Sequence, residues 1–340
     1  MSETITFEPK SSELGYTFGG REPVQQLRPG DVLTVYTEDC FGGAVRTVHD
    51  LPTRVCQMPY LNPVTGPFFI DGAEPGDALA VHFLDIAPAR DWGMSSTFPH
   101  FGALTSTHAT ATLQPPLDER VWRYDIDTAA GLVRFRARGS DYTVDLPLAP
   151  MHGTVGVAPA GLQALSSIMC DVHGGNLDTP EIRAGATLYL PVFVHGAMLA
   201  LGDGHARQGQ GEVSGVAVET AMRTTITVDL IKGAAPATPR LETDEALLSI
   251  GCARPLEDAF RISQHDLVTW VGGLADLDTL DAYQLVAQAS TAPVGNVVDP
   301  NYTMLARIPK AYLKGAVAYG GAHDRLRLTP HQKAAGTGAS

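Results

Sequence analysis

The sequence predicts a β-rich α+β fold, with a β-sandwich or barrel-like N-terminal part and an α/β C-terminal part. Glycine and proline account for 35 and 24 of the 340 residues, and both residue types interrupt helices and mark turns. Turn signals at Pro29-Gly30 and Pro75-Gly76 each precede an apolar run of the kind that forms strands. In the C-terminal third, the apolar spacing becomes helical.

The first strands are expected at residues 31–38 and 77–86, because the phrase Pro-Gly-Asp-x-Leu-x-Val, starting at Pro29 and at Pro75, leads into both segments. Residues 90–115 and 150–186 are expected to be mostly irregular, and long irregular segments in compact proteins are often functional. Further β patterns are expected at residues 121–148 (a hairpin), 187–201 and 212–231.

The C-terminal third combines helical and β patterns. Residues 256–271 and 277–289 carry apolar side chains at helical spacing, and Asp276 is a candidate N-cap for the second of these helices. The segments 246–251 and 302–307 have β character. The C-terminal third is therefore expected to be α/β.

This change of character divides the chain into three parts. We expect a β-rich domain over residues 1–235 that carries the functional site, and an α/β part over residues 236–328. The tail at 329–340 is rich in small and polar residues and is expected to be flexible.

The formal charge of −13 limits the partners. A surface this acidic repels phosphate backbones, so we expect no nucleic-acid partner and no highly acidic substrate. No apolar run reaches the ~20 residues of a membrane span, and no signal-peptide pattern follows Met1. Four widely spaced cysteines without a C-x-x-C pair are typical of reduced thiols, so a cytoplasmic location is expected.

Side chains that can bind a metal are densest between residues 171 and 219. Asp203 and His205 are two positions apart and would share one side of an extended strand. His173 and Asp178 flank a Gly-Gly-Asn turn that could bring both side chains to one point. The full set is Asp171, His173, Asn176, Asp178, His195, Asp203, His205, Glu212 and Glu219. Convergent imidazole and carboxylate groups favour a metal site; the alternative is a turn with solvated acids.

Two glutamates bracket an apolar run. The odd separation of Glu212 and Glu219 puts them on opposite faces of a regular strand unless Gly215 forms a bulge. A carboxylate buried there must be paired or must bind a ligand. An ion pair between Glu219 and Arg223 is the structural alternative. Asp39, which follows the first expected strand, is a further candidate carboxylate.

Nucleophile-based amidase mechanisms are disfavoured. Both the Cys-Glu-Lys and the Ser-Ser-Lys mechanisms need a lysine near the nucleophile, and the chain has none between Lys10 and Lys232. The chain also lacks the G-x-S-x-G elbow of serine hydrolases.

Several segments of the sequence together resemble the acetamidase/formamidase family. The run Asp171-Val-His-Gly-Gly-Asn-Leu-Asp178 resembles the D-x-H-G-G-N-x-D signature of that family. The likeness covers most of residues 30–315, and the length is similar to that of the acetamidase-like branch. Further matching segments are Asp39–Phe41, Asn62–Pro67, Gly72–Asp77, Tyr189–Ala206, Gly211-Glu212, Glu219, Val298–Pro300 and Pro309-Lys310.

The resemblance implies hydrolysis of a small aliphatic amide, such as formamide or acetamide, to a carboxylate and ammonia. It also implies a bound metal, a β-rich fold with an α/β C-terminal part, and an oligomer, a homodimer or a homotetramer. Four residues depart from the family pattern, and they could change the substrate: Gln210, where the family usually has Asp, and His49, His100 and His152.

Our mechanistic hypothesis gives each matched residue a role. The metal ligands are His173, Asp178, Asp203 and His205, with Asp39 as a fifth candidate. Zinc is favoured by imidazole and calcium by carboxylates, so zinc ranks first and calcium second.

The same hypothesis assigns the general base and the group that binds the substrate. Glu219 is the preferred general base and Glu212 the second choice, while Asn176 orients the substrate or stabilises the oxyanion. Two alternatives stay open: a hydrolase of a larger or cyclic amide, and a protein that binds small amides without hydrolysing them.

Overall fold

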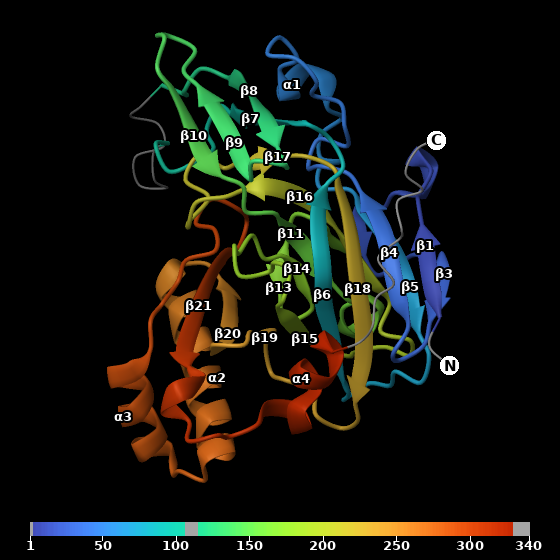
Figure 1. Ribbon diagram of the computed structural model, residues 1–340, viewed down its shortest axis with the longest axis vertical. Coiled ribbons are helices and arrows are strands. Elements are labelled where there is room, and N and C mark those ends of the chain that lie inside the picture. The colour runs from blue at the N-terminus through green and yellow to red at the C-terminus, as the bar shows by residue number, and fades with distance from the viewer. Residues whose placement is uncertain (1–2, 106–114, 329–340) are drawn as a thin grey trace.

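The computed structural model describes residues 3–105 and 115–328, so the tail predicted at 329–340 lies outside the described residues. One sheet of 8 strands forms a first layer (Figure 1). In order across the sheet, its strands are β1 (Thr4–Phe7), β4 (Val32–Thr37), β18 (Met222–Ile231), β6 (Ala78–Pro88), β15 (Thr187–Pro191), β19 (Arg240–Glu242), β20 (Ala246–Ala253) and β21 (Tyr302–Pro309). Neighbouring strands are antiparallel except β1 and β4.

A second sheet has 11 strands. Its main path is β10 (Thr143–Pro147), β9 (Leu132–Arg136), β8 (Arg120–Asp127), β7 (Trp92–Thr97), β17 (Val218–Glu219), β16 (Leu199–Arg207), β11 (Met151–Gly156), β14 (Gly174–Asn176) and β13 (Cys170–Asp171). Strand β5 (Val64–Ile70) pairs with β16, and β3 (Gln25–Leu27) pairs with β5. A separate pair joins β2 (Thr17–Phe18) to β12 (Leu165–Ser166).

The helices are few and mostly C-terminal. The two long ones, α2 (Leu256–Ala275) and α3 (Thr279–Ala289), lie at the lower end in Figure 1, and α2 packs on β20 and β21. The short helices are α1 (Pro52–Val55), α4 (Ala322–Arg327) and the 3₁₀ turns Ser11–Glu13, Ala160–Leu162, Lys310–Tyr312 and Ala318–Gly321. Within the described ranges, no helix is both long enough and apolar enough to cross a bilayer.

The predicted β-rich class is confirmed, and one sheet runs across the expected boundary at residue 235. Strand β19 from the C-terminal part pairs with β15 from the N-terminal part, so the first sheet is continuous. The main apolar core takes side chains from both large sheets, among them Leu33, Phe83, Val155 and Leu201. The division into separate domains remains a prediction.

Some expected elements differ in the structure. Residues 90–115 contain strand β7, whose Gly and Ser residues hide the β pattern although its middle is buried between β8 and β17. The expected strand at 187–201 is two strands, β15 and β16, in different sheets. Asp276 was wrongly predicted as an N-cap, because it ends α2 with φ 51°, while Asp278 caps α3 by accepting from the N–H groups of Leu280 and Asp281.

His152 links the two large sheets. It lies on β11, fully buried, with Nδ1 2.8 Å from the Gly202 carbonyl oxygen and Nε2 2.7 Å from Thr224 Oγ1 on β18. Burial lowers the pKa of this imidazole to about 4, because a charge is costly away from water. The folded protein therefore holds His152 in its neutral form.

We expect His152 to make the protein sensitive to acid. Between pH 6.5 and about 4 the unfolded chain binds a proton at this imidazole and the folded chain does not, so stability falls as pH falls, by about 3 kcal/mol from this group. His152→Gln keeps a donor and an acceptor but does not titrate. Urea unfolding from pH 7 to 4 should therefore show a shallower loss of stability in the variant; parallel curves for the two proteins would contradict the role of His152.

Candidate functional site

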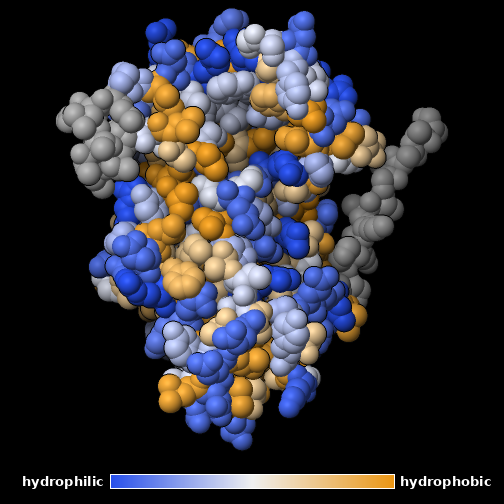
Figure 2. All heavy atoms as spheres, turned by 90° about the vertical axis from the view of Figure 1, so that its left-hand side faces the viewer, coloured by the Kyte–Doolittle hydropathy of each residue, from blue (hydrophilic) through white to orange (hydrophobic). Residues whose placement is uncertain are grey.

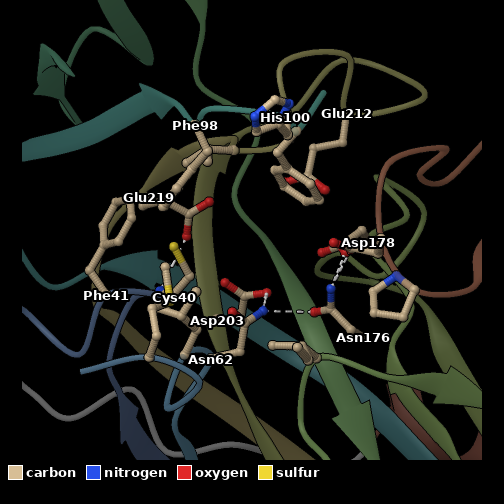
Figure 3. Close-up of a pocket in the computed structure, with 18 of the residues that line it drawn as sticks. Cys40, Phe41, Asn62, Phe98, His100, Asn176, Asp178, Asp203, Glu212 and Glu219 are labelled. Carbon is tan, nitrogen blue, oxygen red and sulfur yellow. Dashed lines mark hydrogen bonds between the residues drawn. The ribbon is translucent and has the colours of Figure 1, made fainter. Parts of the chain in front are cut away.

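A pocket of about 340 Å³ opens where the second sheet meets the C-terminal part. The side chains at one end of this pocket are carboxylates and amides that point toward one another (Figure 3). They come from the loops before β5 and after β14, β16 and α3, and from strands β14, β16 and β17. The polar residues at this end are Asn62, Asn176, Asp178, Asp203, Glu212, Glu219 and Asp299.

Strand β16 places Asp203 and His205 in the site, as their spacing predicts. Both side chains are buried, each with 1% of its surface exposed. His205 Nε2 lies 3.2 Å from Asp203 Oδ1 and 3.2 Å from Glu219 Oε1. Glu219 lies on the neighbouring strand β17, directly opposite His205 in the pairing of β16 with β17. The Glu219–Arg223 ion pair is absent from the described residues, where Arg223 contacts Glu8 instead.

Two groups of potential metal ligands meet in the site. Asp178, His205 and Glu212 form one, and Cys40, Asp203 and Glu219 form the other. In each group the ligand atoms lie within 4.8 Å of one another, and all six residues are buried. The short distance from His205 to Asp203 and Glu219 makes the two groups adjacent.

The side-chain atoms that could bind a metal face a space that stays open because residue 153 is a glycine. Asp178 Oδ1 is buried and accepts no hydrogen bond from the described residues. Gly153, on β11, lies beneath it: a Cβ atom there would come within 2.4 Å of both Asp178 Oδ1 and Asp203 Oδ2. A buried, unpartnered carboxylate oxygen is costly, and a divalent cation would remove that cost. These observations fit a metal ion.

The charges in the site are unbalanced. Burial, and then the neighbouring acids, raise the pKa values of Asp178, Glu212 and Glu219 well above the ordinary range. Burial also raises the pKa of Asp299, to about 6. None of the described residues that line the pocket is Lys or Arg. Because like charges in a low-dielectric site repel strongly, the cluster needs protons or a metal cation.

Asp203 and His205 behave as an ion pair within this cluster. Burial opposes the charged form of Asp203, but the His205 imidazole and its hydrogen bond outweigh burial and lower the Asp203 pKa. Burial also opposes the charged form of His205, but Asp203 outweighs it and raises the His205 pKa. Asp203 therefore favours the charged form of His205, which would offset part of the negative charge of the cluster.

Gln208 fixes which nitrogen of His205 can bind a cation. The Gln208 amide nitrogen donates to the carbonyl oxygens of Asp178 (2.6 Å) and Gly295 (3.1 Å). Its Oε1 therefore faces His205 Nδ1 at 3.0 Å, and Nδ1 must carry the hydrogen. In the neutral imidazole the lone pair is then on Nε2, the atom that points at the carboxylates. Such outer hydrogen bonds orient metal-binding histidines.

Two asparagines hold the carboxylates in place. The Asn176 amide nitrogen donates to Asp178 (2.5 Å) and to Asp299 (2.7 Å). The Asn62 amide nitrogen donates to Asp203 (2.8 Å) and to the Asn176 side-chain oxygen (2.9 Å). Since both N–H groups of Asn176 are engaged, its geometry suits positioning of the carboxylates more than the expected contact with an oxyanion.

The backbone of the site is strained. Four residues in the polar end have φ values in the left-handed region that non-glycine residues rarely adopt: Asn62 (53°), Asp178 (41°), Asp203 (57°) and Glu212 (46°). Such strain costs about 1–3 kcal/mol for each residue and is concentrated at functional sites. The strain therefore supports a functional role for this cluster.

The structure does not bring Asp39 and His173 to the cluster. Asp39 accepts from the N–H groups of Phe41 and Gly43 and from Arg90 (2.7 Å), so it shapes the loop that carries Cys40. His173 packs edge-on against Phe18, with 5.2 Å between ring centroids. It lies in the turn that precedes β14. Its buried ring nitrogens have no partner among the described residues, and burial lowers its pKa to about 4.

Most of the chain matches one known protein family. The model of the acetamidase/formamidase family matches residues 21–165 and 148–261. The chain belongs to this family. It is 29% identical over 266 residues to the acetamidase of Mycolicibacterium smegmatis, a match that covers 61% of this chain and 63% of that protein. The chain thus matches less than two thirds of the length of this curated relative.

Solved structures of family members are similar over nearly the whole chain. The acetamidase of Yersinia enterocolitica superposes with a TM-score of 0.85 at 41% identity, covering 91% of this chain and 93% of that one. The acetamidase of Bacillus halodurans superposes with a TM-score of 0.81 at 29% identity, covering 92% and 99%. The two-sheet fold described above is therefore shared with the acetamidases.

Most of the residues that depart from the family pattern do not line the pocket. His152 is in the core, and His49 and Gln210 are exposed and do not line the pocket. His100 does line it, at its outer end (Figure 3). His195 is exposed and bonds to Glu74, and Asp171 is also exposed. Of the extra histidines, His100 is the one that can meet a substrate.

Sequence reasoning missed four residues of the site: Cys40, Asn62, Gln208 and Asp299. Cys40, Asn62 and Asp299 stand inside segments that match the acetamidase/formamidase family, so the family pattern contained a signal for them. Gln208 lies outside those segments, and only its hydrogen bonds reveal its role. Asp299 belongs to the C-terminal part, so the site is not built from residues 1–235 alone.

We expect Gly153→Ala to weaken metal binding. The new Cβ would displace Asp178 or Asp203, and disturbed ligand positioning typically costs about 10–100-fold in metal affinity. Zinc affinity measured against a competing chelator should fall at least tenfold, while the circular dichroism spectrum is retained. Gly139→Ala is the matched control, because a Cβ at Gly139 meets nothing within 4 Å. Equal zinc affinity in the two variants would contradict a metal above Gly153.

Proposed function

We propose that this chain is a metal-dependent amidase that hydrolyses a neutral amide to a carboxylate and ammonia. The observation that supports this most is the convergence of five carboxylates on a single pocket, with the His205 imidazole within 4.8 Å of the carboxylates of Asp178 and Glu212. The names of the relatives, acetamidase and formamidase, support the reaction class. An oligomer and a cytoplasmic location are part of the proposal; the four cysteines, all free thiols, suit a reducing compartment.

The chain's own donors suit a borderline metal such as zinc. His205 Nε2 would hold it together with Asp178 and Asp203, whose oxygens both face Gly153, and Glu212, Glu219 and Cys40 border the same space. Imidazole and thiolate favour zinc over calcium, whereas the excess of carboxylates keeps calcium as the second choice. When bound, such an ion supplies Lewis-acid chemistry: it polarises a carbonyl and makes water more acidic.

Glu212 is our choice for the general base, ahead of Glu219. The Glu212 carboxylate lines the pocket and accepts no hydrogen bond from the described residues. Glu219 accepts from the N–H groups of Cys40 (3.3 Å) and Ala217 (3.1 Å), and it lies against His205. The raised pKa of Glu212 makes it a stronger base and suits a group that takes up and returns a proton.

The proposed reaction needs one proton transfer in each direction. Glu212 takes a proton from water as the water oxygen attacks the amide carbon, which gives a tetrahedral intermediate. Glu212 then donates this proton to the nitrogen, the C–N bond breaks, and ammonia leaves. The other product is the carboxylic acid, which becomes the carboxylate by releasing its proton to ammonia or to solvent. Asn62 and Asn176 keep Asp203 and Asp178 in position throughout, because their amide groups bond to those carboxylates.

We expect Glu212→Gln to reduce kcat more than Glu219→Gln does. Loss of a general base costs about 10²–10⁴-fold, whereas Glu219→Gln should act mainly by disturbing His205 and metal affinity. Ammonia release from acetamide and zinc content are measured for both variants. A Glu212→Gln variant with full activity would exclude this base. Acetamide binding with no ammonia release by the native protein would instead favour the binding-protein alternative.

Removal of metal should abolish turnover reversibly. Dialysis against a strong chelator is expected to lower the rate of ammonia release at least 10²-fold, because the carbonyl then lacks its Lewis acid. It should also lower the melting temperature, since the buried carboxylates lose their counter-charge. Zinc and calcium are added back separately, and the ion that restores activity is the native candidate. Full activity of a protein shown to contain no metal would rule out metal dependence.

A further inference from the structure

Part of the pocket wall is apolar, in contrast to the carboxylates that line the rest of it. Three phenylalanines and several aliphatic side chains form part of the pocket wall, and Phe41 and Phe98 lie on either side of Glu219 in Figure 3. Figure 2 shows apolar residues gathered in the upper half of one face of the molecule. The apolar residues of the pocket wall are Phe41, Met58, Leu61, Phe98, Phe101, Ile168 and Val216.

This wall is preformed. Phe98 and Phe101 stack edge-on, with 6.2 Å between ring centroids and 90° between ring planes. The Phe101 ring lies directly on Gly215, where a Cβ atom would come within 2.4 Å of it. Phe41, Phe98 and Val216 belong to one buried apolar cluster. The wall therefore needs no rearrangement to present an apolar surface.

The pocket is larger than the smallest amides need. Its volume of about 340 Å³ lies within the ~300–1,000 Å³ range of pockets for drug-sized ligands. Acetamide has four heavy atoms, and at about 30 Å³ for each water-sized group it would fill roughly a third of this space. Acetamide at the carboxylates would leave the aromatic wall without a contact.

We propose that the pocket selects a neutral primary amide that carries an apolar group about the size of a phenyl ring. The carboxylate end disfavours an anionic substrate, and an aromatic group gains most by stacking edge-on with phenylalanine. The amide lies among Asp178, Glu212 and Asp203, and its apolar group lies against Phe98 and Phe101. This inference rests on the proposed amide hydrolysis and deepens it by naming the substrate class.

A substrate panel tests this proposal with the metal-loaded protein. Ammonia release from phenylacetamide, acetamide, formamide and the anionic amide succinamate gives kcat/KM for each. We expect phenylacetamide to exceed acetamide at least tenfold, since even one methylene in an apolar pocket changes selectivity about 10–200-fold. Succinamate should be the poorest substrate. An equal or higher kcat/KM for acetamide, or for the cyclic amide 2-pyrrolidinone, would overturn the proposal.

Variants of the wall make the test specific. Phe101→Ala should lower the ratio of kcat/KM for phenylacetamide to that for acetamide at least tenfold. Phe260→Ala is the matched control, because Phe260 is a partly exposed phenylalanine on α2 outside this pocket. If Phe101→Ala fails to fold, Phe101→Leu takes its place. An unchanged ratio in a folded Phe101 variant would overturn the proposal.

A binding measurement separates this inference from the proposed reaction. Calorimetry with the Glu212→Gln protein, whose turnover should be blocked, gives the affinity for phenylacetamide. One outcome is that phenylacetamide binds tightly, that the Phe101 change weakens this binding, and that the native protein turns over no amide. This outcome would contradict the amidase proposal and support the apolar site. Turnover of acetamide with no measurable binding of phenylacetamide would support the amidase proposal and contradict the proposed apolar site.

Discussion

The enclosure of several carboxylates in one pocket is the constraint on which the rest of the site depends. Taking an acid out of water raises its pKa, and each neighbouring acid raises it further; Asp178, Glu212 and Glu219 all show this. Such a cluster persists only if other groups offset it. Here the offset comes from amide donors, from His205 and, we propose, from a divalent cation in the space that Gly153 keeps free.

The two-sheet fold makes this cluster possible because it brings together residues that lie far apart in the sequence. Strand β16 supplies Asp203 and His205 from the second sheet. The first sheet continues through β19, β20 and β21, and the segment before β21 carries Asp299 back to the pocket. Gln208 joins the two sides, because its amide nitrogen bonds to carbonyl groups of both Asp178 and Gly295. The chemistry of His205 thus depends on the C-terminal part.

The features that could be predicted from the sequence are those that depend on the spacing of nearby residues. The β-rich class, the two long helices, and the convergence of Asp203 with His205 all follow from periodicity. The sequence could not predict where the His173 ring lies, because the ring packs against Phe18, from a distant segment of the sequence. The sequence also could not show that the Asp39 carboxylate is already bound by Arg90 and is thus not available to a metal, since these two residues are 51 positions apart. Contacts between distant segments decide such cases, and local patterns do not record them.

Glu212 and Glu219 show how one residue type takes two roles in one pocket. Both are buried, yet Glu219 is fixed on a strand against His205, while Glu212 lies on a loop with a strained backbone. That loop is held by the aromatic wall, because the Ala103 N–H donates to the Val213 carbonyl oxygen at 2.8 Å and Phe101 rests on Gly215. An apolar group bound against Phe101 would therefore contact a ring that packs on the segment carrying the proposed base. In the proposed reaction, the residues that would bind the apolar group and the residue that would transfer the proton therefore stand on neighbouring, directly hydrogen-bonded segments.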